Sequence, residues 1–235
     1  MTALVMEANA IAKDLGSGAA QIRALKGVDL ALKGGELTLL MGPSGSGKTT
    51  LLSILGCMLT PTEGTVRVCG DLISGKTPED LAKIRRENIG FVFQSYHLFP
   101  TLTAADNVRL ALDVRGENGK EARDKSHAAL DRVGLSGKMG NYPRELSGGE
   151  QQRVAIARAV VGDPSVILAD EPTAALDSEN GKAIMGILAN IAKDPGRGVL
   201  VVTHDPRLVP FAGRIVHIED GLIVREEAGG AAQAS

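Results

Sequence analysis

The glycine-rich stretch at residues 42–49 has the residue types and spacing of a phosphate-binding loop. It contains Gly42, Pro43, Ser44, Gly45, Ser46, Gly47, Lys48 and Thr49, with Thr50 next, and fits the pattern G-x-x-x-x-G-K-[ST]. Glycines let the backbone curl so that successive N–H groups point at phosphate oxygens, and a helix start adds positive charge. We expect Lys48 to contact the β- and γ-phosphates of a nucleotide and Thr49 to bind Mg²⁺. A plain strand–helix turn is the alternative.

Two carboxylates and one histidine follow apolar runs that are typical of buried strands. Asp170 and Glu171 come directly after residues 166–169, and His204 comes directly after residues 199–203. We expect Asp170 to hold Mg²⁺, directly or through water, and Glu171 to be the general base that polarises an attacking water. His204 is expected to sense the γ-phosphate or to orient that water. An acidic turn and a structural histidine are the alternatives, which the upstream phosphate-binding pattern disfavours.

Short apolar runs that alternate with helical patterns predict an α/β fold with a mainly parallel sheet. Strands are expected at 37–41, 166–169 and 199–203, and a helix at 48–57. Ligands of such sheets bind at the carboxyl ends of the strands, where all the residues above fall.

The chain is predicted to form one domain with three parts. The α/β core takes about 1–94 and 163–227, a helical subdomain takes about 95–162, and an Ala/Gly-rich disordered tail takes 228–235. A hairpin with its turn at Asp220-Gly221 is expected near the C-terminus.

The bulk composition and charge exclude some classes of partner. The chain has 26 Lys and Arg against 28 Asp and Glu, a net charge of −2 that argues against nucleic acid as a partner. No apolar run approaches the roughly 20 residues of a membrane-spanning helix. Residues 1–15 lack the basic start of a signal peptide. The sequence therefore predicts a cytoplasmic protein that does not insert into a membrane.

A second glycine-containing motif points to a known family. Leu146-Ser147-Gly148-Gly149-Glu150-Gln151-Gln152-Arg153 resembles the LSGGQ signature of ABC (ATP-binding cassette) ATPases, with Glu150 where Gln is often found. The order of motifs is also similar: the glycine-rich loop, Gln94, the signature, Asp170-Glu171, the loop at 174–177, and His204. The resemblance extends over nearly the whole chain, from about residue 5 to residue 227.

The resemblance implies the ABC ATPase fold, with an N-terminal antiparallel β subdomain, ATP and Mg²⁺ as cofactors, and hydrolysis coupled to transport. In that family, the signature of one subunit closes over the γ-phosphate bound to its partner. A head-to-tail dimer around ATP is therefore expected, either a homodimer or a pair with a closely related ABC subunit. Ser147, Gly148, Gly149 and Glu150 then form a second phosphate-binding end at the start of a helix.

The resemblance also implies a role for Gln94 and a membrane partner. Gln94 is implied to contact Mg²⁺ and the attacking water, and its loop to couple the site to a separate membrane permease. The chain would then be peripheral on the cytoplasmic face of the inner membrane.

The chain departs from the family pattern at the position that contacts the nucleobase. Most ABC ATPases stack the adenine on an aromatic residue near the N-terminus, and the alignment puts Leu15 at that position. No Phe, Tyr or Trp precedes Phe91 in the sequence. We expect the base to lie on Leu15, helped by the guanidinium of Arg23. The affinity for ATP should then be modest, because leucine lacks the aromatic stacking that contributes about 1–3 kcal/mol to binding of a base.

Aromatic residues gather on both sides of Gln94 in an otherwise aromatic-poor chain. Phe91 and Phe93 alternate along a predicted strand and share one face. Tyr96 and Phe99 follow in a loop, which indicates a docking surface, and the family resemblance places the coupling helix of a permease there. The alternative is that these residues seal the junction between the subdomains.

The local sequence at residues 23–25, 90–94 and 98–100 resembles that of one bacterial branch of the family. That branch includes ATPases of lipoprotein release, macrolide-type efflux, glycolipid export and cell division. The first hypothesis is a transport ATPase for export or extraction of a hydrophobic or amphiphilic substrate. The second is a mechanical or signalling ATPase that acts on a membrane partner without moving cargo.

Overall fold

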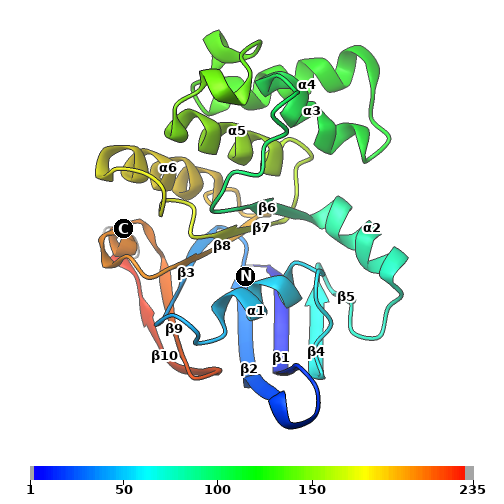
Figure 1. The fold of residues 1–235 in the computed structure, drawn as a ribbon, viewed down its shortest axis with the longest axis vertical. Helices are drawn as coiled ribbons and strands as arrows, with labels where there is room; N and C mark the ends of the chain where they lie inside the picture. The colour runs from blue at the N-terminus through cyan, green and yellow to red at the C-terminus, as the bar shows by residue number, and fades with distance from the viewer. Residues whose placement is uncertain (1–2, 231–235) are drawn as a thin grey trace.

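A six-stranded sheet forms the centre of the computed structural model, which describes residues 3–230 (Figure 1). The strand order is β10-β9-β3-β8-β7-β6. The strands are β3 (Glu36–Met41), β6 (Ile89–Val92), β7 (Val166–Asp170), β8 (Gly198–Thr203), β9 (Arg214–Glu219) and β10 (Leu222–Ala228). All neighbouring pairs are parallel except β9 and β10. The predicted α/β class with a mainly parallel sheet is confirmed.

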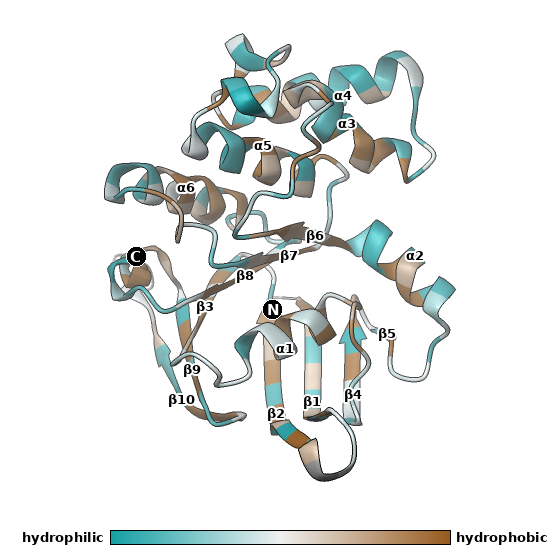
Figure 2. Ribbon diagram, viewed as in Figure 1, coloured by the Kyte–Doolittle hydropathy of each residue, from teal (hydrophilic) through white to brown (hydrophobic). Residues whose placement is uncertain are grey.

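The central strands are apolar because both faces of the sheet are covered. Figure 2 shows hydrophobic residues gathered on β3, β7 and β8. Along β8, Leu200 and Val202 belong to one hydrophobic core, whereas Val199 and Val201 belong to the other. This alternation between two cores explains the unbroken apolar runs, since a parallel sheet is buried on both sides.

The pairing register brings the carboxyl ends of the strands to one edge. Met41 of β3 lies opposite Thr203 of β8, and Asp170 of β7 lies opposite Val202 of β8. The residues that follow β3, β7 and β8 therefore meet at this edge, which is where ligands of α/β sheets bind.

A second, antiparallel sheet covers one face together with helix α1 (Lys48–Leu55). Its order is β2-β1-β4-β5, with β1 (Leu4–Leu15), β2 (Ile22–Lys33), β4 (Glu63–Val68) and β5 (Asp71–Leu72). This is the N-terminal antiparallel β subdomain that the family resemblance implied. Helix α2 (Pro78–Asn88) leads from it into β6.

The other face carries helix α6 (Ser178–Ile191) and a group of helices at the top of Figure 1. These are α3 (Ala104–Asp113), α4 (Gly119–Arg132) and α5 (Gly148–Val160), which lie between β6 and β7 in the sequence. Short 3₁₀ helices lie at Gly18–Ala20, Ser136–Lys138, Pro143–Glu145 and Pro206–Phe211.

The C-terminal end of the described chain belongs to the sheet, because β10 extends to Ala228 and Gly229 donates its N–H to the carbonyl of Gly213. Residues 231–235 of the expected disordered tail lie outside the described residues. Of the helices within residues 3–230, none has the length and apolar character required to cross a membrane.

Candidate nucleotide-binding site

The glycine-rich stretch forms the loop between β3 and α1, as its pattern predicts. Gly47 precedes the first residue of α1 with φ 99°, a left-handed conformation that favours glycine. A Cβ at Gly42 would overlap the carbonyl oxygen of Ile218 on β9. The loop can therefore hold its tight curve only with glycine at these two positions. Its open backbone N–H groups at the start of α1 form an anion-binding end.

Lys48 lies folded against this loop. Its Nζ donates to the carbonyl oxygens of Gly42 and Pro43 at 2.8 and 2.7 Å. Burial lowers the pKa of the Lys48 ammonium, and the nearby carboxylates of Glu171 and Asp170 oppose that shift. The ammonium is thus held in the loop by two carbonyls that phosphate oxygens can replace as acceptors.

The turn between β9 and β10 supports the loop from behind. Gly221 donates its N–H to the carbonyl of Ser46 at 3.1 Å, and it accepts the N–H of Lys26 at 2.9 Å. The Lys26 ammonium forms an ion pair of 2.5 Å with Asp220. Sequence reasoning predicted the turn as a hairpin signal but did not place it at the phosphate-binding loop. No local pattern could do so, because Lys26 and Asp220 are 194 residues apart.

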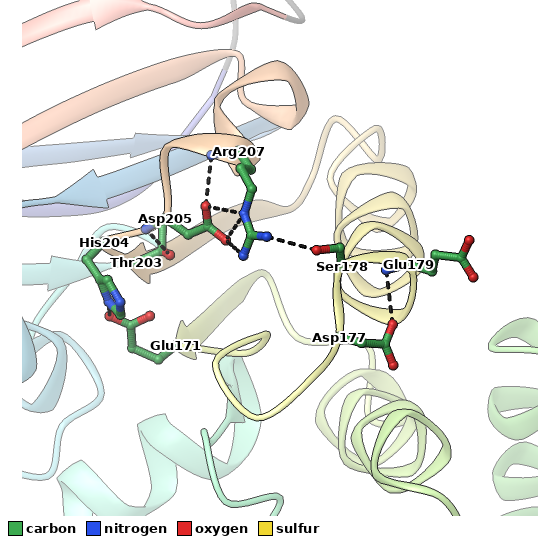
Figure 3. Close-up of polar contacts among 8 residues, drawn as sticks. All are labelled: Glu171, Asp177, Ser178, Glu179, Thr203, His204, Asp205 and Arg207. Carbon is green, nitrogen blue, oxygen red and sulfur yellow. Dashed lines mark hydrogen bonds and ion pairs between the residues drawn. The ribbon is translucent and has the colours of Figure 1, made fainter.

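Asp170, Glu171 and His204 meet where β7 and β8 end. His204 Nδ1 lies 2.7 Å from Glu171 Oε1, as the close-up in Figure 3 shows. Glu171 has a φ of 45°, a strained value for a residue with a side chain, and donates its N–H to Val202. Burial raises the pKa of the Asp170 carboxyl, and Glu171 adds to this, while Lys48 acts in the opposite direction. A cation placed beside Asp170 would offset this unfavourable burial of charge.

A cavity of about 840 Å³ joins most of the predicted site residues. Its lining includes Leu15, Pro43, Ser44, Gly45, Gly47, Lys48, Thr49, Thr50, Gln94, Asp170, Glu171 and His204. Ile22, Ala24, Ala174, Val202, Asp220 and Gly221, which sequence reasoning did not select, line it as well. Gly42 and Ser46 shape the loop behind this surface.

The predicted magnesium ligands Thr49, Gln94 and Asp170 all line that cavity. Their hydroxyl, amide and carboxylate oxygens are the hard donors that Mg²⁺ prefers. Among residues 3–230, no group of three or more His, Cys, Asp or Glu side chains is arranged to hold a metal by itself. The donor set therefore fits an ion that takes its remaining ligands from phosphates and water.

The predicted signature lies apart from this cavity, at the start of α5. Ser147 and Glu150 form a capping box, in which Ser147 donates its N–H to Glu150 Oε2 at 2.8 Å and Ser147 Oγ accepts from the N–H of Glu150. The N–H of Ser147 lowers the pKa of the Glu150 carboxyl, which also lies 3.4 Å from the Lys138 ammonium. One chain thus presents two separate helix N-termini, at α1 and at α5, of the kind that favours anions.

The two signature glycines are closely packed by side chains of the same chain. A Cβ at Gly148 would lie 2.9 Å from the hydroxyl oxygen of Tyr96, and a Cβ at Gly149 would lie 2.7 Å from Asn180 Oδ1. Asn180 in turn donates to Asp177, which caps α6. Figure 3 shows Asp177 and Ser178 at the start of α6, with Arg207 donating to Ser178 and to Asp205 beside His204.

Leu15, Ile22 and Arg23 line one part of the cavity, so the residue expected to contact the base and the guanidinium expected to help it lie together there. Leu15 pairs with Ile22 at the end of the β1–β2 hairpin, and the two side chains are 40% and 69% exposed. Arg23 is 3.0 Å from Glu63 and 3.8 Å from Asp14. Sequence reasoning missed Ile22, because only the hairpin register places it beside Leu15.

The loop after Gln94 contains one aromatic residue that fits a docking surface and one that fits a seal at the subdomain junction. Phe99 is 50% exposed, as a docking residue should be. Tyr96 is half-buried against Gly148 and so lies at the junction with α5. Asn107, which is fully buried, fixes the loop by accepting the N–H of Phe99 at 2.8 Å and donating to its carbonyl at 3.1 Å.

Proteins of known family are similar to this chain over most of its length. The family model described as "ABC transporter" matches residues 25–174, which is more than half of the chain. The pyoverdine export ATP-binding/permease protein PvdT of Pseudomonas fluorescens (strain Pf0-1) is 45% identical over 219 residues, covering 93% of this chain and 33% of PvdT. The macrolide export ATP-binding/permease protein MacB of Salmonella choleraesuis (strain SC-B67) is 46% identical over 224 residues, covering 95% and 34%. The chain thus spans about a third of the length of these relatives.

A solved structure shares the fold over nearly the whole chain. It is the ATP-binding cassette MJ0796, described as a dimer in a post-hydrolysis state bound to ADP and Pi. The TM-score is 0.87 at 43% identity, with 95% of this chain and 98% of that chain covered. With the phosphate-binding loop, the paired carboxylates and the signature in their expected places, the chain belongs to the ABC transporter family, as one of its ATP-binding cassettes.

Proposed function

We propose that this chain is an ATP-hydrolysing subunit that dimerises around ATP and drives a separate membrane permease. The observation that carries the proposal is the single cavity that joins the phosphate-binding loop to Gln94, Asp170, Glu171 and His204. A loop that only bound phosphate would not require a carboxylate and an imidazole in contact at its open side.

Within this cavity, each group has a part that its position supports. The loop N–H groups and Lys48 bind the phosphates, and the base lies on Leu15 and Ile22. Glu171 accepts the proton of the attacking water, while His204, 2.7 Å from its carboxylate, holds that carboxylate in place. Thr49, Gln94 and Asp170 would hold Mg²⁺, which would neutralise charge on the phosphates.

The signature completes the site from a second chain. Ser147 to Glu150 lie outside the cavity of their own chain, at a helix N-terminus suited to an anion. Because the phosphate-binding loop and the signature are both present, two copies placed head to tail would form two equivalent composite sites. The dimeric state of MJ0796 supports this arrangement.

The proposed cargo class follows from the relatives. PvdT and MacB are both described as export proteins, which favours export over a mechanical role without cargo. We therefore propose that the permease exports or extracts a hydrophobic or amphiphilic substrate. The cassette itself would act at the cytoplasmic face of the membrane.

Phosphate release by the purified chain tests the ATPase assignment directly. We expect ATP-dependent release of inorganic phosphate that requires Mg²⁺ and rises more steeply than linearly with protein concentration, because the active form is a dimer. The rate per chain, measured over a wide range of dilution, decides the point. Hydrolysis that is independent of concentration down to the monomer would contradict the composite site.

The Leu15→Tyr variant should bind ATP about tenfold more tightly than the parent, because an aromatic ring adds stacking to the apolar contact. The parent should bind ATP and GTP with similar affinity. Fluorescence titration of both nucleotides measures these affinities, with Leu72→Tyr as the matched control, because Leu72 is 39% exposed on β5 and lies outside the cavity. A parental preference for ATP above about tenfold, unchanged by Leu15→Tyr, would place base recognition elsewhere.

Replacing Phe99 by alanine should weaken binding to the permease while basal ATPase activity persists. Exposed aromatic anchors commonly contribute about 2 kcal/mol or more to an interface, whereas Phe99 does not line the cavity. Co-purification of the permease with the tagged chain from detergent-solubilised membranes measures the effect. Val114→Ala, at another exposed apolar residue of the helical part, is the control. Equal recovery of permease with Phe99→Ala and with the parent would contradict a docking role.

A further inference from the structure

Arg158, near the end of helix α5, binds the loop that follows Gln94. Its guanidinium donates to the carbonyl of His97 at 2.6 Å and to the carbonyl of Tyr96 at 2.8 Å. Burial lowers the pKa of this half-buried group. A buried cation is unfavourable unless it is bonded, so the two carbonyls and the guanidinium depend on each other.

The backbone of that loop has an unusual shape that presents both carbonyls to Arg158. Tyr96 and His97 have φ values of 60° and 48°, two successive left-handed residues that are not glycine. Such a conformation persists only where the surroundings hold it. The His97 ring also packs 4.6 Å from the ring of Phe93, which is next to Gln94. The loop is therefore fixed relative to Gln94 on one side and to Arg158 on the other.

Tyr96 contacts the beginning of the same helix as well. Its hydroxyl oxygen is so close to Gly148, the first residue of α5, that a Cβ there would lie 2.9 Å from it. Arg158 is in the last turn of α5, and Gly148 is in the signature. One residue, two positions after Gln94 in the sequence, thus contacts both ends of the signature helix.

We propose that Tyr96 and Arg158 form a link that makes the signature helix move with Gln94, so that Arg158 is a positioning residue for the composite ATP site. The proposal rests on the proposed function, in which the signature acts on the partner chain's nucleotide. A shift of Gln94 within the cavity passes through the Phe93–His97 loop to both ends of α5 and so to Ser147 and Gly148. Arg158 does not line the nucleotide cavity and acts only through this loop.

Hydrogen exchange of the monomer tests the link without requiring a dimer. In dilute protein that is monomeric by ultracentrifugation, ATP should slow exchange both in residues 42–49 and in residues 147–151 of the parent. In Arg158→Gln, we expect the slowing at 42–49 to remain and that at 147–151 to be lost. Arg158→Lys should recover part of it, because an ammonium can still donate to both carbonyls. Arg123→Gln, at an exposed position on α4, is the matched control and should behave like the parent.

Dimerisation provides a second measurement, in the Glu171→Gln background. We expect Arg158→Gln to raise the ATP concentration for half-maximal dimer formation by about tenfold, with nucleotide affinity of the monomer changed by less than about twofold. Tyr96→Phe, which removes the hydroxyl at Gly148, should act in the same direction. Because both changes break one link, their combined effect should be smaller than the product of the two.

Three outcomes separate the possibilities. Retained slowing at 147–151 in Arg158→Gln overturns the link, whatever the dimer does. Equal loss of slowing at 42–49 and 147–151, together with a lowered melting temperature, shows a purely structural role and also overturns it. A Glu171→Gln parent that binds ATP without dimerising contradicts the proposed function, while the exchange result still decides the link.

Discussion

Glu171→Gln is expected to slow ATP hydrolysis by about 10²–10⁴-fold while ATP binding persists, because removal of a positioned general base typically costs that much. The glutamine has the same shape and can still bond to His204 in the place of Glu171 Oε1, which lies 2.7 Å from the imidazole. Only the ability to accept a proton is lost. With hydrolysis blocked, ATP stays between the chains, and the dimer should accumulate.

Two measurements check this expectation together. Phosphate release gives the rate, and size-exclusion chromatography with and without ATP gives the fraction of dimer. Glu179→Gln is the matched control, because Glu179 is an exposed carboxylate in the first turn of α6. A Glu171→Gln variant that hydrolyses ATP at nearly the parental rate would remove Glu171 from the catalytic role and leave His204 and Gln94 as the candidates.

Mixing two inactive variants should restore activity, if each ATP site is shared between chains. Lys48→Ala removes the ammonium that the loop carbonyls hold, and Ser147→Arg blocks the signature. Each variant alone forms dimers in which both sites are damaged. In a mixed dimer, both changes fall in one site and the other site is intact. An equal mixture should therefore reach about a quarter of the parental rate, given random pairing and independent sites.

The control for this experiment is a chain that carries both changes. Mixed with the parent, it gives hybrid dimers with one damaged group in each site and should add no activity. Thermal unfolding checks that Ser147→Arg folds, because loss of the α5 cap costs about 1 kcal/mol. If the two single variants stay inactive at every mixing ratio, although they bind each other, the signature does not act across the dimer.

Strands of the central sheet such as β7 and β8 could be predicted because burial on both faces gives each of them an unbroken run of apolar residues. Residues 166–169 and 199–203 are apolar without interruption, since the two faces of the sheet meet two different cores. Because neighbouring parallel strands end at one edge, these two runs also predict that Asp170, Glu171 and His204 lie close together. The phosphate-binding loop was predictable for a similar reason, because its chemistry lies in consecutive residues.

The antiparallel sheet could not be predicted from the residue pattern. Strand β1 contains several register shifts against β2, and Ala10 within it has a φ of 50°. Each shift reverses which residues face the core, so the alternation of polar and apolar residues that marks a strand is lost. Only the family resemblance supplied this sheet, and the pairing that places Ile22 beside Leu15 became visible only in the structure.

Contacts between segments that are distant in the sequence could not be predicted from the residue pattern either. Arg158 and the loop that it binds are 61 and 62 residues apart, and an arginine on a helix has no feature that indicates its partner. The position of Tyr96 in a loop predicts docking, because aromatic residues in loops often serve that purpose. The structure packs Tyr96 on Gly148, as the alternative interpretation has it, while docking by Tyr96 stays a prediction.

The support of the phosphate-binding loop by the β9–β10 turn has a consequence for biosynthesis. Gly42 packs against Ile218, and Lys26 pairs with Asp220, 194 residues further along the chain. At about 5–20 residues per second, the ribosome needs on the order of ten to forty seconds to make that stretch. During this time the nascent chain carries the loop without its support. A chain still attached to the ribosome should therefore bind nucleotide only after the β9–β10 hairpin has left the exit tunnel.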